Sequence, residues 1–392
     1  METKLDDYIA EINAEIIAIR RQIHQNPELS FQEFETSKLI FDFLKELGLT
    51  PQIVGKTGVT AIIQNEKHDL SKGCIALRAD MDALPITEQT ELSFVSQNNG
   101  IMHACGHDVH TSVLLGVAKT LVKFKEHLSE PVKLIFQQGE EVLPGGASVL
   151  IEAGILKNPT VNRIYGLHVA PELNVGEIGW KKGIYMASCD EIHLTIHGKG
   201  GHGALPQNCI DPIVIGASLI TNIQQIISRK SDPKIPSVLT FGYFEGLGAT
   251  NVIPSEVKIK GTFRTFNEEW RTKAHAWISD FVHATCQAHG ATADLNIKKG
   301  YPFLQNDEKT VSDFVEKLKQ TSSIQLKELE IRMTSEDFAY YSQKIPACFF
   351  RLGTSNNDPK TQFSVHNPQF SIDEKAIDLG IKAFCLGVLE IL

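Results

Sequence analysis

The chain has 392 residues, of which 42% are hydrophobic and 22% are charged, an ordinary globular composition. This length predicts two domains. The formal net charge of −9 disfavours a nucleic-acid or anionic-membrane partner. No stretch approaches the ~18 consecutive apolar residues of a transmembrane helix. Seven scattered cysteines predict a reducing, cytoplasmic location rather than a disulfide framework.

The N-terminal region predicts two helices. Isoleucines at helical spacing from Ile9 to Ile23 mark the buried face of the first helix, and Asn26-Pro27 ends it. Ser30, followed three residues later by Glu33, has the spacing of a capping box and predicts the start of the second helix. We expect both helices to serve packing.

Two predicted strands follow, Val59–Ile63 and Cys74–Ala79, and the second leads directly into Asp80-Met81-Asp82. Open α/β sheets keep their active groups at the carboxyl ends of the strands. A single Asp there is more often a cap or a turn residue, but two that flank one residue favour an active-site role.

Residues 103–110 are rich in metal-binding side chains: three histidines, one cysteine and one aspartate fall within eight positions. Cys105 and His107 are two residues apart and can face one ion. A thiolate and an imidazole suit zinc, manganese or a similar divalent metal. For two ligands alone, a His-rich loop with a core cysteine is the simpler interpretation, so the rest of the chain has to supply further ligands.

Two more apolar strands lead to ligand-capable side chains. Val132–Phe136 is followed by the adjacent Glu140 and Glu141, which repel each other unless a cation is present. Alone, such a pair is more often a solvated turn. The strand Arg163–Leu167 is ended by His168, where a lone histidine is usually structural. The alternation of strands and helices between residues 50 and 180 predicts a mostly parallel α/β sheet.

The pattern changes after residue 184. Ile192, Leu194 and Ile196 alternate with polar residues, as in a half-buried strand, and the glycine-rich loop at 198–203 contains His202. This loop does not fit a dinucleotide-binding fingerprint. A helix, two strands, a helix and a strand follow, and the order β-α-β-β-α-β predicts a ferredoxin-like unit. We therefore expect an inserted domain at 184–297 and a discontinuous metal-binding domain at 1–183 and 298–392.

The α/β domain resumes after Tyr301-Pro302. Met333–Phe338 predicts the acidic start of a helix, and Ala347–Leu352 predicts a strand. His366 lies in a predicted loop before the last helix. Six residues, all at predicted strand–loop junctions, thus belong to one domain: Cys105, His107, Glu140, Glu141, His168 and His366.

This set suits a two-metal hydrolase. In such an enzyme, a water molecule deprotonated near neutral pH attacks a carbonyl that a metal polarises. One glutamate must stay free of the metals to act as general base.

On these motifs, the chain resembles the co-catalytic-metal peptidase family that holds aminoacylase and carboxypeptidase G. It is more similar to the amidohydrolase branch of hippurate hydrolase, N-acetyl-amino-acid deacetylase and indoleacetyl-amino-acid hydrolase. The resemblance covers nearly the whole chain. The motifs that carry it are Leu77–Pro85, His103–His110, Glu140-Glu141, Gly166–Val169, Gly198–His202 with Pro206, Asn251–Pro254, Gly261–Arg264, Ser335–Phe338 and His366.

The resemblance implies a role for each site residue. It makes Glu140 the general base and implies two divalent metal ions per subunit, zinc or manganese, with nickel or cobalt as alternatives. It makes Asp82 the residue that orients a metal-binding histidine. The implied metal ligands are Cys105, His107, Glu141, His168 and His366.

The resemblance also implies that the inserted domain forms a homodimer and acts as a lid. His202 of the partner subunit is then expected to stabilise the tetrahedral oxyanion. Asn251 and Arg264 are expected to hold the carboxylate of the substrate, which an arginine can do through two hydrogen bonds.

We therefore expect a cytoplasmic, metal-dependent amidohydrolase that cleaves N-acyl-L-amino acids, such as acetyl, benzoyl or indoleacetyl conjugates. The sequence departs from the branch at Gln138-Gly139, Ala170 and Gln207, which bears on pocket shape rather than on hydrolysis. The alternatives are a dipeptidase or carboxypeptidase, an N-acetyl-diaminopimelate deacetylase, a non-catalytic binding protein, and a thiol-dependent hydrolase that uses Cys105 and His107.

Overall fold

A computed structural model describes residues 2–390 of the chain. The chain forms two compact units, each described here by itself. Unit 1 comprises residues 1–185, 305–331 and 337–392, and unit 2 comprises residues 186–304 and 332–336. Residues 1, 391 and 392, which the predicted domain boundaries include, lie outside the described residues. No described helix is both long enough and apolar enough to cross a membrane.

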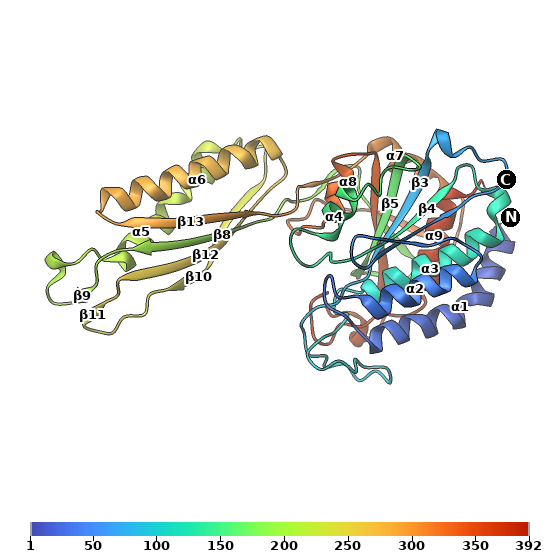
Figure 1. The fold of residues 1–392 in the computed structure, drawn as a ribbon, viewed down its shortest axis with the longest axis horizontal. Helices are drawn as coiled ribbons and strands as arrows, with labels where there is room; N and C mark the ends of the chain where they lie inside the picture. Colours follow the sequence, from blue (N-terminus) through green and yellow to red (C-terminus); the bar gives the residue numbers. More distant parts are fainter. Residues whose placement is uncertain (1, 391–392) are drawn as a thin grey trace. The chain divides into compact units, whose positions relative to one another are not determined.

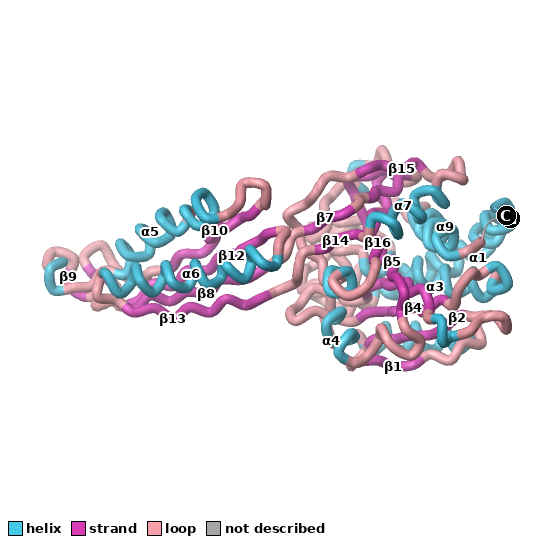
Figure 2. The backbone as a smooth tube through the Cα atoms, turned by 90° about the horizontal axis from the view of Figure 1, so that it is seen from above, coloured by secondary structure: helices cyan, strands magenta, loops and turns pink. Residues whose placement is uncertain are grey.

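Unit 1 is built on an eight-stranded sheet with the order β1-β2-β4-β3-β5-β16-β6-β15 (Figures 1 and 2). Its central strands β4, β3, β5 and β16 are mutually parallel, whereas β2 joins β4, and β6 joins β16, in antiparallel pairing. The strands are β1 Gln52–Val54, β2 Gly58–Ile63, β3 Cys74–Asp80, β4 Val132–Gln137, β5 Val161–Asn174, β6 Glu177–Trp180, β15 Gln325–Glu328 and β16 Ala347–Ser355; β7 Gly183–Met186 and β14 Leu304–Asn306 lie where the chain passes between the units.

The helices of unit 1 pack around α3 and against the sheet. Helix α3 contacts β3 and β5, and α1, α2 and α9 lie beside it (Figure 1). β3, β4 and β16 are buried along their whole length, which explains their nearly continuous apolar sequences. The helices are α1 Glu2–Gln25, α2 Phe34–Glu46, α3 His107–Lys123, α4 Gly146–Glu152, α7 Glu308–Leu318, α8 Ala339–Ser342 and α9 Ala376–Val388.

Unit 2 is a four-stranded antiparallel sheet with the order β10-β12-β8-β13, packed against α5 and α6 (Figure 2). This order and the element sequence β8-α5-β10-β12-α6-β13 confirm the predicted ferredoxin-like unit. A short β9–β11 pair joins the glycine-rich loop to the segment after Asn251. The elements are β8 Asp190–His197, β9 Gly201–His202, α5 Pro212–Ile223, β10 Ser237–Glu245, β11 Val252–Ile253, β12 Glu256–Thr265, α6 Glu268–Ala288 and β13 Thr292–Lys299.

Three local predictions were wrong. Ser30 and Glu33 form no capping box: Glu33 precedes α2 without a side-chain cap, and Ser30 Oγ donates to Asp82 instead. His168 does not end its strand, because β5 continues to Asn174. Residues 333–338 do not begin a helix, and only Ala339–Ser342 is helical, because Asp337 turns its carboxylate into the core rather than toward a helix end.

Candidate metal centre

Gly106 sets the start of α3, from which Cys105 and His107 extend. Its φ of 83° lies in the left-handed region, and a Cβ at this position would lie 2.6 Å from Val169 Cγ2. Only glycine meets both demands. The tight turn places Cys105 and His107 in the buried interior at one end of the helix.

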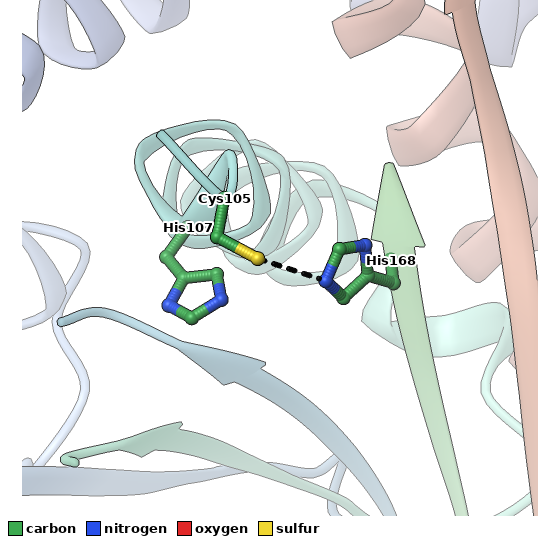
Figure 3. A group of neighbouring side chains, drawn as sticks. All are labelled: Cys105, His107 and His168. Carbon is green, nitrogen blue, oxygen red and sulfur yellow. Dashed lines mark hydrogen bonds between the residues drawn. The ribbon is translucent and has the colours of Figure 1, made fainter. Parts of the chain in front are cut away.

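His168, on the neighbouring strand β5, faces these two residues. In Figure 3 the sulfur of Cys105 points toward the ring of His168, and His107 lies beside it. The distance from Cys105 Sγ to His168 Nε2 is 3.3 Å. His168 Nδ1 lies 2.8 Å from the carbonyl oxygen of Val169 and therefore carries the proton. The Nε2 lone pair of His168 is left to face the thiol, as in a metal ligand.

Asp82 orients His107 and the loop of the two glutamates. Its Oδ1 lies 3.2 Å from His107 Nδ1, so that nitrogen donates and Nε2 is free to bind a cation. Its Oδ2 accepts from Ser30 Oγ at 2.6 Å and from the backbone N–H of Glu141 at 2.9 Å. Ser30, which the sequence predicts only as the start of a helix, thus helps to build the site.

Glu140 and Glu141 occupy the loop after β4. Glu140 is buried, and its Oε1 accepts from the backbone N–H of Asp337 at 3.2 Å. Glu141 Oε1 lies 3.3 Å from His366 Nε2 and 3.9 Å from His107 Nε2. The structure therefore brings the two carboxylates to the same cluster of imidazoles.

His366 reaches the cluster from a loop far along the chain. Its φ of 67° is uncommon for a residue with a side chain, and its backbone N–H donates to the carbonyl of Ala104 at 2.7 Å. That bond ties the His366 loop to the segment just before Cys105. About half of the His366 side chain is exposed, whereas the other five predicted residues of the cluster are buried or nearly so.

The residues fit a divalent metal by their contacts and their charge. His107 Nε2 and Glu141 Oε1 are buried and make no hydrogen bond within residues 2–390, an arrangement that is rare unless another group binds there. Among the described residues, five sets of potential ligand atoms lie within 4.8 Å of one another. Three of the sets contain only predicted site residues: Cys105 with His107 and His168, Cys105 with Glu141 and His366, and His107 with Glu140 and Glu141.

The electrostatics of the site point the same way. Burial alone lowers the pKa of His107, but Asp80, Asp82 and Glu141 outweigh it and raise the pKa to about 10. Burial, with the nearby Glu141 and Glu140, raises the pKa of the Cys105 thiol. The site thus carries an excess of negative charge, and a divalent cation would neutralise it and favour the thiolate.

Asp80 and His110 also lie here, although sequence analysis assigned neither of them an individual role in the site. His110 Nδ1 lies 2.6 Å from Asp80 Oδ1, and His110 Nε2 accepts from the backbone N–H of Val169 at 2.9 Å. Both nitrogens are occupied, so His110 supports the site and does not bind a metal. The Asp80-Met81-Asp82 spacing signals the two aspartates, but their different partners cannot be inferred from spacing.

The remaining predicted residues belong to unit 2. His202 is exposed on β9, pairs with Val252, and is followed by Gly203, whose N–H donates to the carbonyl of Asn251. The backbone N–H of Ala204 donates to His202 Nδ1 at 3.1 Å, so the neutral ring carries its proton on Nε2. Arg264, on β12, donates through Nη1 to the carbonyl of Met333 at 3.0 Å.

Comparison with known proteins identifies the family of the chain. The model of Peptidase family M20/M25/M40 matches residues 76–390. The chain is 40% identical to the N-acetyl-L-cysteine deacetylase of Bacillus subtilis, over 94% of this chain and 86% of that protein. It is 36% identical to thermostable carboxypeptidase 2 of Saccharolobus solfataricus, over 99% and 98% of the two chains.

A solved structure extends the comparison to the fold. The YXEP protein of Bacillus subtilis, described as a dinuclear metal binding peptidase from the M20 family, superposes with a TM-score of 0.81 at 35% identity, over 96% of this chain and 98% of that chain. The chain therefore belongs to Peptidase family M20/M25/M40, in its amidohydrolase branch, and is a metal-dependent hydrolase of amide bonds.

Proposed function

We propose that the enzyme hydrolyses N-acyl-L-amino acids to a carboxylate and a free amino acid. The observation that carries this proposal is the cluster of the buried Cys105, His107 and His168 with the largely buried Glu141, beside a second carboxylate, Glu140. A metal site next to a spare carboxylate supplies both parts of a hydrolytic reaction. The similarity to a deacetylase of N-acetyl-L-cysteine supports acyl-amino acids as the substrate class.

Five residues would hold two divalent ions, zinc or manganese, with nickel or cobalt as alternatives. Cys105 would be a ligand in either of two sets, since its sulfur lies near His107 and His168 and also near Glu141 and His366. When bound, the ions polarise the scissile carbonyl and activate water at neutral pH. Asp82 holds His107 in the tautomer that this ligation needs.

Glu140 acts as the general base. Its carboxylate takes a proton from the attacking water and returns it to the amide nitrogen, so that the C–N bond breaks and the amine leaves. The hydrogen bond from the Asp337 backbone N–H fixes one carboxylate oxygen of Glu140. Because the water attacks directly, no covalent acyl-enzyme forms and the Cys105 sulfur does not act as a nucleophile.

His202, Asn251 and Arg264 recognise the polar parts of the substrate. His202 of the partner subunit donates its Nε2–H to the developing oxyanion, and the Ala204 N–H sets this tautomer. Arg264 uses Nε and Nη2 for the substrate carboxylate, since Nη1 already donates to Met333. Asn251 lies directly before β11, the strand that pairs with His202, and adds a side-chain amide to the same surface.

Unit 2 mediates a homodimer in this proposal, and the enzyme works in the cytoplasm. Edge strand β10 and helix α5 expose apolar side chains that a second copy would cover: Ile213, Val214, Tyr243 and Phe244. The seven cysteines are all free, which suits a reducing compartment. Sedimentation velocity tests the dimer, and a monomer at micromolar concentration would contradict it.

Release of free α-amine from a panel of substrates tests the reaction. The panel contains N-acetyl-, N-benzoyl- and indoleacetyl-amino acids, N-acetyl-diaminopimelate and dipeptides, each with added manganese or zinc. We expect release from the acyl-amino acids and little from the dipeptides. The Glu140→Gln variant, purified in the same way, controls for contaminating hydrolases.

A carboxypeptidase is the second candidate, because a relative at 36% identity carries that name. Cleavage of dipeptides but not of acyl-amino acids would move the enzyme to that class. Cleavage of N-acetyl-diaminopimelate alone would identify a biosynthetic deacetylase. No release from any substrate by a protein with its full metal content would contradict catalysis itself.

A further inference from the structure

A buried arginine connects the two sides of the metal centre. Arg78, on β3, is fully buried and donates from all three guanidinium nitrogens. Its Nη1 donates to Asp80 Oδ2 at 2.6 Å, its Nη2 to Asp337 Oδ1 at 2.8 Å, and its Nε to Gln137 Oε1 at 3.0 Å. A planar fork of donors in one orientation suits this task, whereas a lysine offers only a point charge.

On one side, Arg78 leads to the general base. The Asp337 carboxylate also accepts from Gln137 Nε2 at 2.8 Å and from the backbone N–H of Ala147 at 2.9 Å. These bonds leave the Asp337 carboxylate no freedom to turn. The backbone N–H of the same residue donates to Glu140 Oε1, so the position of Asp337 fixes the position of the base.

On the other side, Arg78 is connected through Asp80 and His110 to β5, the strand that carries His168. Asp80 Oδ1 lies 2.6 Å from His110 Nδ1, and His110 Nε2 accepts from the Val169 N–H, the residue next to His168. Asp80 thus uses one oxygen for Arg78 and the other for His110. The guanidinium stands between two buried carboxylates that would otherwise repel each other.

We propose that Arg78 and Asp337 are positioning residues. They hold the Glu140 carboxylate at a fixed position relative to β5, the strand that carries His168. Neither residue touches the substrate. Their effect is to keep the base carboxylate within reach of the attacking water, and a displacement of about 1 Å can cost about 100-fold in rate. This inference rests on the proposed role of Glu140 as the base.

Two conservative variants test the proposal. Arg78→Lys keeps the charge but cannot reach Asp80, Asp337 and Gln137 together. Asp337→Asn keeps the size but places an amide N–H₂ where one carboxylate oxygen accepts from donors. We expect kcat to fall about 100-fold in each variant, with KM within about threefold and metal content unchanged. The double variant should lose little more than either single variant, because the two act through one contact.

Lys133→Met is the matched control. Lys133 is a buried cation on β4, near the strand end opposite Gln137, and donates to the carbonyls of Ile155, Lys157 and Pro159. Its loss should lower the thermal unfolding midpoint while kcat stays within about twofold. A kcat loss in Lys133→Met equal to that in Arg78→Lys would overturn the proposal, because buried charge alone would then explain it.

The remaining outcomes are equally decisive. Wild-type kcat in Arg78→Lys and Asp337→Asn, or a loss that only follows lost metal, would overturn the proposal. Asp337→Asn decides alone if Arg78→Lys does not fold. Rates are measured on whichever amide the wild type cleaves, so a wrong substrate class leaves the test intact. If the wild type cleaves none, the proposed function fails, and the crystal structure of the folded variant decides instead: a displaced Glu140 carboxylate supports the inference and an unmoved one overturns it.

Discussion

The two units hold their proposed functional residues in opposite ways. In unit 1 the groups around Cys105 are mostly buried, and their orientation is set by hydrogen bonds to the Asp82 carboxylate and the Val169 carbonyl and from the Asp337 N–H. In unit 2, His202 and Asn251 are exposed. The difference teaches that the chain alone holds the proposed groups of unit 1 in fixed orientations, whereas the proposed groups of unit 2 lie open to solvent.

Removal of metal should have the largest effect and should act on unit 1 alone. A chelator should abolish turnover, and added manganese or zinc should restore it. Loss of the ions would also leave Glu141 and Cys105 in an anionic cluster, which should destabilise unit 1. Calorimetry should show a lower unfolding temperature for unit 1 and no change for unit 2. Activity that survives the chelator would favour a thiol-dependent hydrolase that uses Cys105 and His107.

Replacement of the general base should affect rate without affecting metal. Glu140→Gln should lower kcat by about 10³–10⁴-fold, because the attacking water loses its proton acceptor. Metal analysis should find wild-type content, whereas Cys105→Ala, the contrasting variant, should lower metal occupancy. Lost metal in Glu140→Gln would sink the assignment of Glu140 as base, and full occupancy in Cys105→Ala would count against that ligand.

Replacement of the exposed histidine should have a smaller effect that depends on the dimer. His202→Ala should lower kcat by about 10²–10³-fold through loss of an oxyanion donor. Mixing it with inactive Glu140→Gln should restore part of the activity, because a mixed dimer pairs an intact base with an intact His202. His289→Ala, an exposed histidine at the end of α6, is the control. No recovery on mixing would contradict a donor from the partner subunit.

The smallest effect on turnover is expected from replacement of Asp190, a buried residue of unit 2 whose protonation in acid should weaken that unit. Burial alone would raise the pKa of Asp190, but hydrogen bonds from His275 and Arg271 outweigh it and lower the pKa. The folded pKa lies below the unfolded one, so the contribution of Asp190 is present above about pH 4 and is lost as pH falls below it.

Tryptophan fluorescence can follow this loss. Trp270 and Trp277 belong to α6 of unit 2, and a Trp180→Phe background removes the tryptophan of unit 1. Asp190→Asn should be less stable at pH 7 by about 1.5–3 kcal/mol and should lose less stability on acidification. An equal acid response in the two proteins would show that another group controls it.

Much of the fold, and much of the cluster of candidate metal ligands, could be predicted from the sequence. Residues 132–136 form a continuous apolar run that predicts a buried strand, and the clustered ligand types of residues 103–110 predict a metal site. The network behind the cluster could not be predicted. Asp80 and Asp82 look alike in sequence, yet one pairs with Arg78 and the other with His107, because Asp80 is the last residue of β3, near Arg78, whereas Asp82 lies beyond the strand, where it meets His107.

Local motifs failed where long-range contacts were stronger. Ser30 and Glu33 have the spacing of a capping box, but Asp82 attracts the serine hydroxyl, and Glu33 accepts from the Gly139 N–H and from Thr57 Oγ1. All three partners lie at least 24 residues away along the chain. A pattern that spans four residues has no means to detect them.

The position of β16 has a consequence for how the protein is made. This strand lies beside β5 in the middle of the unit 1 sheet, but about 170 residues separate them in sequence, and unit 2 is synthesised in between. At about 5–20 residues per second, the ribosome needs about 9–35 seconds to deliver β16 after β5. During that interval we expect unit 2 to fold first, while the open edge of β5 waits for its partner. A nascent chain arrested before residue 347 should therefore bind chaperones, and one released after residue 390 should not.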